Sequence, residues 1–266
     1  MSRRRKNKKK AALKGQVLFG LSVIIIAALS LIVYELKKTH IDRDSITMCR
    51  NDGKITRETA IVVDATDSFS QSQALMIQKE IRNTLENSLI DERFTLYILK
   101  EDIDSNSEKF IVCNPGDGSD KSELTSNKRR LLKNWEIKFY EKITSAIDEM
   151  IGKNTADRSP IMEMIKFASI NTMYQSSAQE KKLIVISDMM HHTASFSHYK
   201  ANLKYEDFEK TSYALKVRPQ LSGVDLQILY LFREQNSLKQ NRGHIRFWEE
   251  YALKSGGQVT HVKTVN

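Results

Sequence analysis

The stretch "TAIVVDATDS", residues 59–68, places an acid and a series of hydroxyls directly behind an apolar run. Residues 60–63 are apolar and mostly β-branched, which is typical of a strand buried on both faces. Farther on, an apolar residue recurs at every fourth position, the spacing of one helical face: Ile77, Ile81, Leu85 and Leu89. The order is therefore strand, loop, helix, with Asp64 at the end of the strand.

The rest of the chain repeats this alternation. "RFTLYILK" (93–100) and "KFIVC" (109–113) predict two strands of an antiparallel hairpin because their link is short. Further strands are expected at 183–186, 224–232 and 258–265, and helices at 128–151, from Ser159 and Pro160, at 205–215 and at 246–257. This order predicts an α/β fold, a Rossmann-like doubly wound, mostly parallel sheet with one antiparallel edge strand.

A transmembrane helix is expected ahead of this domain. Residues 15–34 are 20 consecutive uncharged residues, about the length that crosses ~30 Å of hydrocarbon. The apolar run is longer than the ~7 to 15 residue core of a cleaved signal peptide. We therefore expect an uncleaved signal anchor, with a cleaved signal as the alternative.

The distribution of charge predicts the orientation of that helix. Residues 1–14 form an arm with eight Lys or Arg, and fewer basic residues follow the span. The positive-inside bias places the amino terminus in the cytoplasm and the domain in the periplasm of a bacterial inner membrane. Residues 39–266 hold 32 basic and 32 acidic residues, so the net charge of +9 comes from the amino terminus. Nucleic-acid binding is not expected from so balanced a domain.

The sequence has two cysteines, one just after the predicted membrane span and one at the end of a predicted strand. Cys49 belongs to a polar, patternless segment, 35–57, which we interpret as a stalk, and Cys113 ends a predicted strand of the domain, 58–266. In an oxidising, exported compartment an even pair predicts a disulfide. In the opposite topology both residues would be thiols.

Two predicted strands end in acids, and hydroxyls accompany them. Asp64, Thr66 and Ser68 alternate along the chain, so an extended loop can direct a carboxylate and two hydroxyls to one point. Ser159 supplies a third hydroxyl and Asp188, in "KKLIVISD", a second carboxylate. Ligands of such sheets bind beyond the carboxyl ends of the strands. Oxygen donors favour Mg²⁺, with Mn²⁺ or Ca²⁺ as related choices.

At these residues the sequence resembles the von Willebrand factor type A domain. The metal-ion-dependent adhesion site of that family reads Asp-x-Ser-x-Ser, then a distant Thr and a distant Asp. Asp64 corresponds to the first acid, and Thr66 and Ser68 to the serines. Ser159 corresponds to the threonine and Asp188 to the last acid, so two positions depart from the pattern but keep a hydroxyl. The resemblance implies a divalent cation and recognition of a protein partner, without catalysis or a small-molecule substrate.

Three other interpretations stay open. The first is a metal-free structural subunit of a membrane or envelope assembly for secretion or defence. The second is a metal-dependent phosphohydrolase with Asp64 as nucleophile, although Thr66 stands where a general acid is expected. The third is a zinc site among His191, His192 and His198, whose spacing fits no metalloprotease pattern, so we expect solvated loop histidines.

Overall fold

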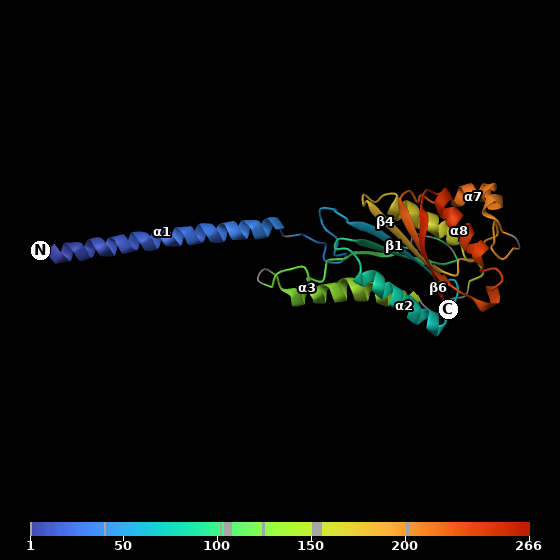
Figure 1. Ribbon diagram of the computed structural model, residues 1–266, viewed down its shortest axis with the longest axis horizontal. Coiled ribbons are helices and arrows are strands. Elements are labelled where there is room, and N and C mark those ends of the chain that lie inside the picture. The colour runs from blue at the N-terminus through green and yellow to red at the C-terminus, as the bar shows by residue number, and fades with distance from the viewer. Residues whose placement is uncertain are drawn as a thin grey trace. The chain divides into compact units, whose positions relative to one another are not determined.

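The computed structural model describes residues 2–39, 41–101, 103, 108–123, 126–150, 156–200 and 203–266. The chain divides into two compact units, Met1–Asp42 and Arg43–Asn266. The first contains helix α1, Ser2–Thr39, and the second contains all the other elements (Figure 1).

Helix α1 contains the predicted membrane span. The segment Lys14–Tyr34 is long and apolar enough to cross a membrane, and within the described residues it is the one such helix. Its large apolar side chains are exposed, for example Phe19 at 72% and Ile24 at 66%. An apolar helix of this length matches the thickness of the hydrocarbon core of a bilayer.

The second unit is built on one six-stranded sheet with the order β3-β2-β1-β4-β5-β6. Its strands are β1 Arg57–Asp64, β2 Arg93–Leu99, β3 Glu108–Cys113, β4 Glu180–Ser187, β5 Val224–Leu231 and β6 Gln258–Val265. Only β3 runs antiparallel, paired with β2, so the predicted α/β fold class is confirmed. The strand order reverses between β1 and β4, where such sheets place their ligands.

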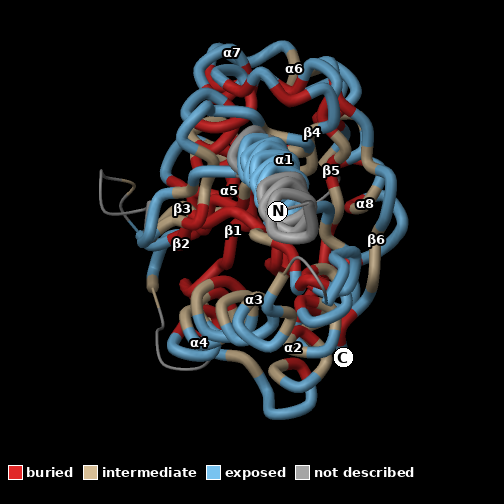
Figure 2. The backbone as a smooth tube through the Cα atoms, turned by 90° about the vertical axis from the view of Figure 1, so that its left-hand side faces the viewer, coloured by how far each residue is buried: buried red, intermediate tan, exposed pale blue. Residues whose placement is uncertain are grey.

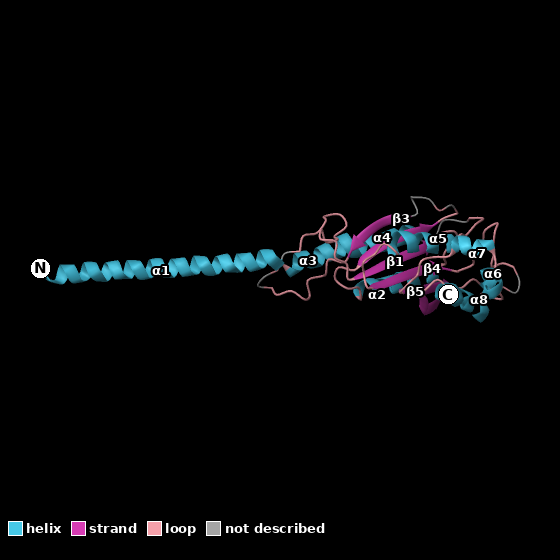
Figure 3. Ribbon diagram, turned by 90° about the horizontal axis from the view of Figure 1, so that it is seen from above, coloured by secondary structure: helices cyan, strands magenta, loops and turns pink. Residues whose placement is uncertain are grey.

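Helices cover both faces of the sheet (Figure 3). One layer consists of α2 Gln71–Glu86, α3 Lys128–Trp135, a π-helical turn η2 Glu136–Tyr140 and α4 Glu141–Met150. The other consists of α5 Ile161–Ala168 with the π-helical turn η3 Ser169–Met173, α6 Tyr205–Glu209, α7 Ser212–Val217 and α8 Arg242–Lys254. A short 3-10 turn, η4 Glu234–Asn236, follows β5.

The opening stretch fits this arrangement because both faces of β1 are buried. Ala60 and Val62 pack in the hydrophobic cluster under α5 to α8, and Ile61 and Val63 pack in the cluster under α2 to α4. Buried backbone accordingly runs through the middle of the unit (Figure 2). Burial on both faces explains why the strand lacks the alternation of a half-exposed strand.

The segment Arg43–Thr56, expected to be part of a stalk over 35–57, belongs to the globular unit. Arg43 and Arg50 pair with Asp91 at 2.5 and 3.2 Å. The disulfide Cys49–Cys113 is formed, which confirms the predicted pairing. The polar composition had suggested a free linker, but here the polar side chains are ion-paired to the domain.

The start of the last helix differs from the predicted one. The last helix begins at Arg242, earlier than expected, because the Asn241 side chain accepts hydrogen bonds from the amides of Gly243 and His244. The predicted helix over 128–151 is confirmed as α3, η2 and α4. Part of the β2–β3 link, 102 and 104–107, lies outside the described residues.

Candidate metal and docking site

The two acid-ended strands are direct neighbours in the sheet. β1 and β4 pair in parallel, with Val63 opposite Ile186, so their carboxyl ends reach the same edge. Asp64 is the last residue of β1, and Asp188 follows the last residue of β4. Both side chains are buried, with 5% and 4% exposed. The topology therefore places two buried acids where the strand order reverses.

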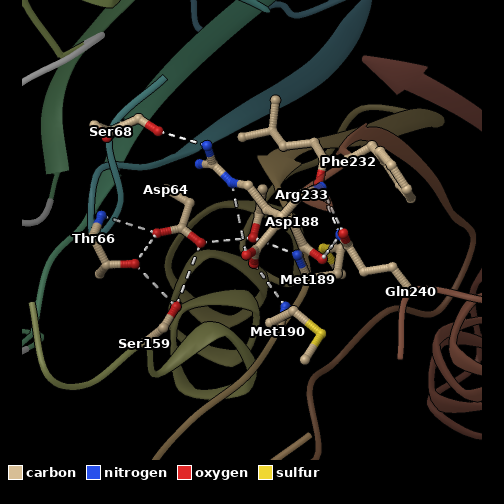
Figure 4. A network of polar contacts seen from close by, with 12 residues as sticks. Asp64, Thr66, Ser68, Ser159, Asp188, Met189, Met190, Phe232, Arg233 and Gln240 are labelled. Atoms are coloured by element: carbon tan, nitrogen blue, oxygen red, sulfur yellow. Dashed lines mark hydrogen bonds and ion pairs between the residues drawn. The ribbon is translucent and has the colours of Figure 1, made fainter. Parts of the chain in front are cut away.

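Among the described residues, Asp64 accepts hydrogen bonds from neutral donors (Figure 4). Its Oδ1 accepts from the amide of Thr66 at 3.1 Å and from the Thr66 hydroxyl at 2.6 Å. Its Oδ2 accepts from the hydroxyl of Ser187 at 2.6 Å and from that of Ser159 at 3.4 Å. The Thr66 and Ser159 hydroxyls are 3.2 Å apart. Three hydroxyls thus converge on one carboxylate.

The sequence order Ser159-Pro160 at a predicted helix start predicts that Ser159 caps the helix, and this prediction is wrong. Helix α5 begins at Ile161, and its N-cap is Pro160, which supplies no side-chain cap. Two backbone hydrogen bonds, both 2.9 Å, pair Ser159 with His192 in an isolated bridge. This pairing fixes Ser159 outside the helix, and its hydroxyl lies against Asp64 and Thr66 instead.

Asp188 has one oxygen satisfied and one that is not. Oδ1 accepts from the amide of Met190 at 2.8 Å. Oδ2 is buried without a hydrogen-bond partner among the described residues, and its nearest cation is Arg233, with Nε at 4.0 Å. Met189, which lies between Asp188 and Met190 in the sequence, adopts a positive φ of 59°, a costly conformation for a residue with a side chain. The Met189 carbonyl accepts from the indole of Trp248 at 3.1 Å, which anchors this turn.

Burial shifts the titration of both acids in the same direction. It raises the pKa of Asp188 to about 7, and the neighbouring charge of Asp64 adds to that shift. Burial also raises the pKa of Asp64, although its hydroxyl partners oppose the change. Two carboxylates near each other in a poorly solvated place favour protonation unless a cation joins them. The cluster is therefore short of positive charge.

Ser68 is placed differently from the other predicted ligands. Its side chain is exposed, and its carbonyl accepts from Arg233 Nη1 at 2.6 Å. Arg233 is itself positioned by Gln240, whose Oε1 accepts from the Arg233 amide at 2.7 Å. The structure thus brings Asp64, Thr66, Ser159 and Asp188 to one end of the sheet and connects Ser68 through Arg233.

Two residues of this cluster were not predicted. Ser187 directly precedes Asp188 in "VISD". Because neighbouring side chains along a strand point to opposite sides, the sequence does not indicate that both reach the cluster. Arg233 follows β5 within "YLFR", the third strand end at this edge. The available signals were the last residue of β4 for Ser187 and the position just behind β5 for Arg233.

The donor set suits a hard divalent cation. The available ligands are carboxylate and hydroxyl oxygens, which Mg²⁺ and Mn²⁺ prefer. The unpaired Oδ2 of Asp188 is the observation that fits a missing cation. Within the described residues, no cluster of three or more His, Cys, Asp or Glu side chains is arranged to hold a metal, so the hydroxyls are essential to the proposed set.

The prediction of solvated histidines is wrong for His191 and His198. They are 0% and 2% exposed, whereas His192 is half-buried. His191 Nε2 lies 3.0 Å from the hydroxyl of Tyr213. Burial lowers the pKa of His191 to about 3 and that of His198 well below its usual value, so both are neutral at pH 7. The helical spacing of Trp248 with Ile245 and Tyr251 predicts a core position, and Trp248 is 0% exposed, which confirms it.

Comparisons with known proteins give a limited result. No family model matches the chain, and no curated protein matches it. An aerotolerance-related membrane protein from Bacteroides fragilis, with multiple mutations to serines, is similar at 14% identity and a TM-score of 0.37, over 79% of this chain and 92% of that one. BatB from Bacteroides thetaiotaomicron, a conserved hypothetical protein, is similar at 14% identity and a TM-score of 0.38, over 79% of this chain and 90% of that one. Similarity at this level transfers neither site residues nor activity.

Proposed function

We propose that this chain is a membrane-anchored, von Willebrand A-like docking module that holds a divalent cation at the carboxyl end of its sheet. Asp64, Thr66, Ser68, Ser159 and Asp188 would hold Mg²⁺, or Mn²⁺ or Ca²⁺. The observation that supports this most is the buried pair Asp64 and Asp188, whose hydrogen bonds come from neutral groups. When bound, the cation supplies an electrophilic position that can accept a carboxylate from a protein partner.

The chain's own residues prepare the site for such a cation. The Thr66, Ser159 and Ser187 hydroxyls orient Asp64. The turn at Met189 orients Asp188 through the amide of Met190. We propose binding without catalysis, because the resemblance to the von Willebrand factor type A domain implies recognition of a protein partner. A phosphohydrolase would be supported instead by metal-dependent phosphate release that Asp64→Asn abolishes.

A calorimetric titration tests the cation. The full chain in neutral detergent is titrated with Mg²⁺ and with Mn²⁺, beside Asp64→Asn and Asp188→Asn. Glu86→Gln, which removes an exposed carboxylate at the end of α2, is the matched control. We expect one site in the wild type and the control and none in the two site variants. Equal binding by all four proteins would remove the proposal.

Arg233 supports a second candidate, a metal-free structural subunit of a membrane assembly. Its guanidinium lies 4.0 Å from Asp188, donates to the carbonyl of Ser68 at 2.6 Å and contacts Gln73 at 3.3 Å. One arginine thus connects the loop after β1 with the end of β4. If the titration shows no cation and partner capture from solubilised membranes is unchanged by a chelator, this second function is the one supported.

We propose that the domain lies outside the cytoplasm of a bacterial inner membrane, with the amino terminus inside. The eight basic residues before Gly15 and the disulfide Cys49–Cys113 support this orientation. A reporter that is active only after export, fused behind Asn266, should be active. A fusion active only in the cytoplasm would reverse the orientation.

A further inference from the structure

A second feature lies at the same end of the sheet. A cleft of about 810 Å³ opens between the segment that follows β4 and the start of α8. Three lysines line it, Lys200, Lys204 and Lys239. None of the three has an ion pair with a described residue, and no acidic side chain lines the cleft within the described part of the chain. The cleft therefore carries uncompensated positive charge.

The floor of the cleft holds an unsatisfied polar atom. His198 lines the cleft although it is only 2% exposed. Its Nδ1 lies 3.0 Å from the Met189 carbonyl and 2.9 Å from His244 Nε2. Its Nε2 is buried and has no hydrogen-bond partner among the described residues. A buried polar atom without a partner costs free energy, and this one belongs to a residue that lines the cleft.

The same cleft has an apolar part. Leu203 and Phe247 line its wall, and Leu238 at the rim is 91% exposed. An inorganic anion would make no use of these side chains, and a flat lipid surface would not reach a concave floor. An acidic polypeptide segment with an apolar side chain complements both the lysines and the leucines.

The cleft is connected to the candidate cation site by the chain itself. Gln240 next to the cleft donates to the carbonyl of Asp188 at 3.0 Å. Lys239 and Tyr199 both line the cleft, and the Lys239 Nζ lies 6.0 Å from the centre of the Tyr199 ring. Asp188 also contributes to the raised pKa of Tyr199, after burial. The cleft therefore lies near the candidate cation site.

We infer that the cleft between Lys200 and Gly243 is a docking subsite for an acidic segment of the partner, one that carries an apolar residue among its carboxylates. This inference rests on the proposed docking function and names the chemistry of the partner. The lysines pair with the carboxylates, and Leu203, Leu238 and Phe247 contact the apolar side chain.

Fluorescence anisotropy tests the inference with a defined probe, a fluorescein-labelled Glu-Glu-Leu-Glu-Glu peptide. The full chain in neutral detergent is titrated in EDTA, so that a cation cannot contribute. The test variant is Lys200→Gln with Lys204→Gln and Lys239→Gln. The control variant removes three exposed lysines elsewhere, Lys54→Gln with Lys79→Gln and Lys133→Gln.

We expect the cleft variant to bind the peptide about tenfold more weakly than the wild type and the control variant to match the wild type, as expected for three exposed ion pairs. A Gln-Gln-Leu-Gln-Gln peptide should bind weakly to all three. Leu238→Ser should also weaken binding of the acidic peptide. Equal losses in both triple variants would show non-specific attraction and overturn the subsite.

Two further outcomes separate this inference from its alternatives. Displacement of the peptide by millimolar inorganic phosphate, or by phosphatidylglycerol vesicles, would overturn the peptide in favour of a general anion or lipid site. Absence of peptide binding in EDTA, together with normal Mg²⁺ titration, would overturn the subsite and leave the cation function standing. A cleft variant that titrates with Mg²⁺ like the wild type shows that the two sites fail independently.

Discussion

The sheet buries two carboxylates at each of its ends and treats them differently. At the amino end, Glu58 and Glu92 are both 0% exposed, and arginines pair with them. Arg93 contacts Glu58 at 2.7 Å, and Arg57 contacts Glu92 at 2.5 Å. At the carboxyl end, Asp64 and Asp188 have hydroxyl and amide partners, and the one arginine nearby is 4.0 Å away. The same scaffold thus pairs the first two acids fully and leaves the second two short of cationic charge.

This difference shows that burial alone is not the signal of a site. Burial raises the pKa of Glu58 as well, but the hydrogen bond from Arg93 opposes the shift. At Asp188 burial and the charge of Asp64 act together, and Arg233 opposes them weakly. A buried acid that already has its counter-ion is structural, whereas a pair that lacks one is prepared for an external cation.

Breaking the paired end should have the largest effect. Arg93→Ala leaves Glu58 buried without its partner, so we expect the free energy of unfolding to fall by about 3 kcal/mol. Urea denaturation of the full chain in detergent measures this. Arg246→Ala removes an exposed arginine paired with Glu250 at 2.9 Å and should cost under about 0.5 kcal/mol. Similar losses in the two variants would contradict the structural role of the amino-end pairs.

Replacing the Asp188 carboxylate by a neutral side chain should raise the free energy of unfolding when no metal is present. The pKa of Asp188 is about 7 in the folded protein and near 3.8 when unfolded, so the unfolded state ionises first. The stability that the protonated acid contributes is complete below pH 4 and is lost as pH rises through 7. In EDTA, Asp188→Asn should therefore match the wild type near pH 4 and exceed it by about 4 kcal/mol at pH 8. Glu86→Gln, which removes an exposed carboxylate away from the site, is the matched control.

Removing Arg233 should have a smaller effect, on the affinity of the site for Mg²⁺. Arg233→Gln takes away a positive charge 4.0 Å from Asp188 Oδ2, so we expect Mg²⁺ to bind about five to ten times more tightly. Arg233→Lys keeps the charge and should stay closer to the wild type. Calorimetry compares the three proteins. Weaker binding in Arg233→Gln would show that the contact to the Ser68 carbonyl matters more than the competing charge.

The sequence predicted the fold and the placement of the acids because both depend on local patterns. Asp64 and Asp188 each follow an apolar run that is visible in the sequence. Because these two runs form parallel neighbouring strands, the two acids reach the same edge of the sheet. Ser159 was placed near the cluster but with the wrong local structure, since its backbone pairing with His192 joins two distant segments.

Burial of polar side chains was the harder part. His198 lies in a polar segment of the sequence, yet its ring packs against Phe247 and Trp248 of α8, with ring centres 4.7 and 5.2 Å away. Arg233 lies beyond a strand that ends without an acid, so only the sheet order shows that it reaches Asp188. Contacts of this kind depend on tertiary packing that no local pattern encodes.

Anomalous X-ray scattering from crystals of the full chain soaked in Mn²⁺ tests the central claim most directly, because it locates the ion. The account predicts an anomalous peak at the carboxyl end of β1 and β4, within coordinating distance of Asp64 and the Thr66 or Ser68 hydroxyl, and no peak at Glu58 or Glu92. The same soak of Asp64→Asn crystals should leave the site empty. A wild-type crystal without a peak there, or with Arg233 moved into direct contact with Asp188, would contradict the account.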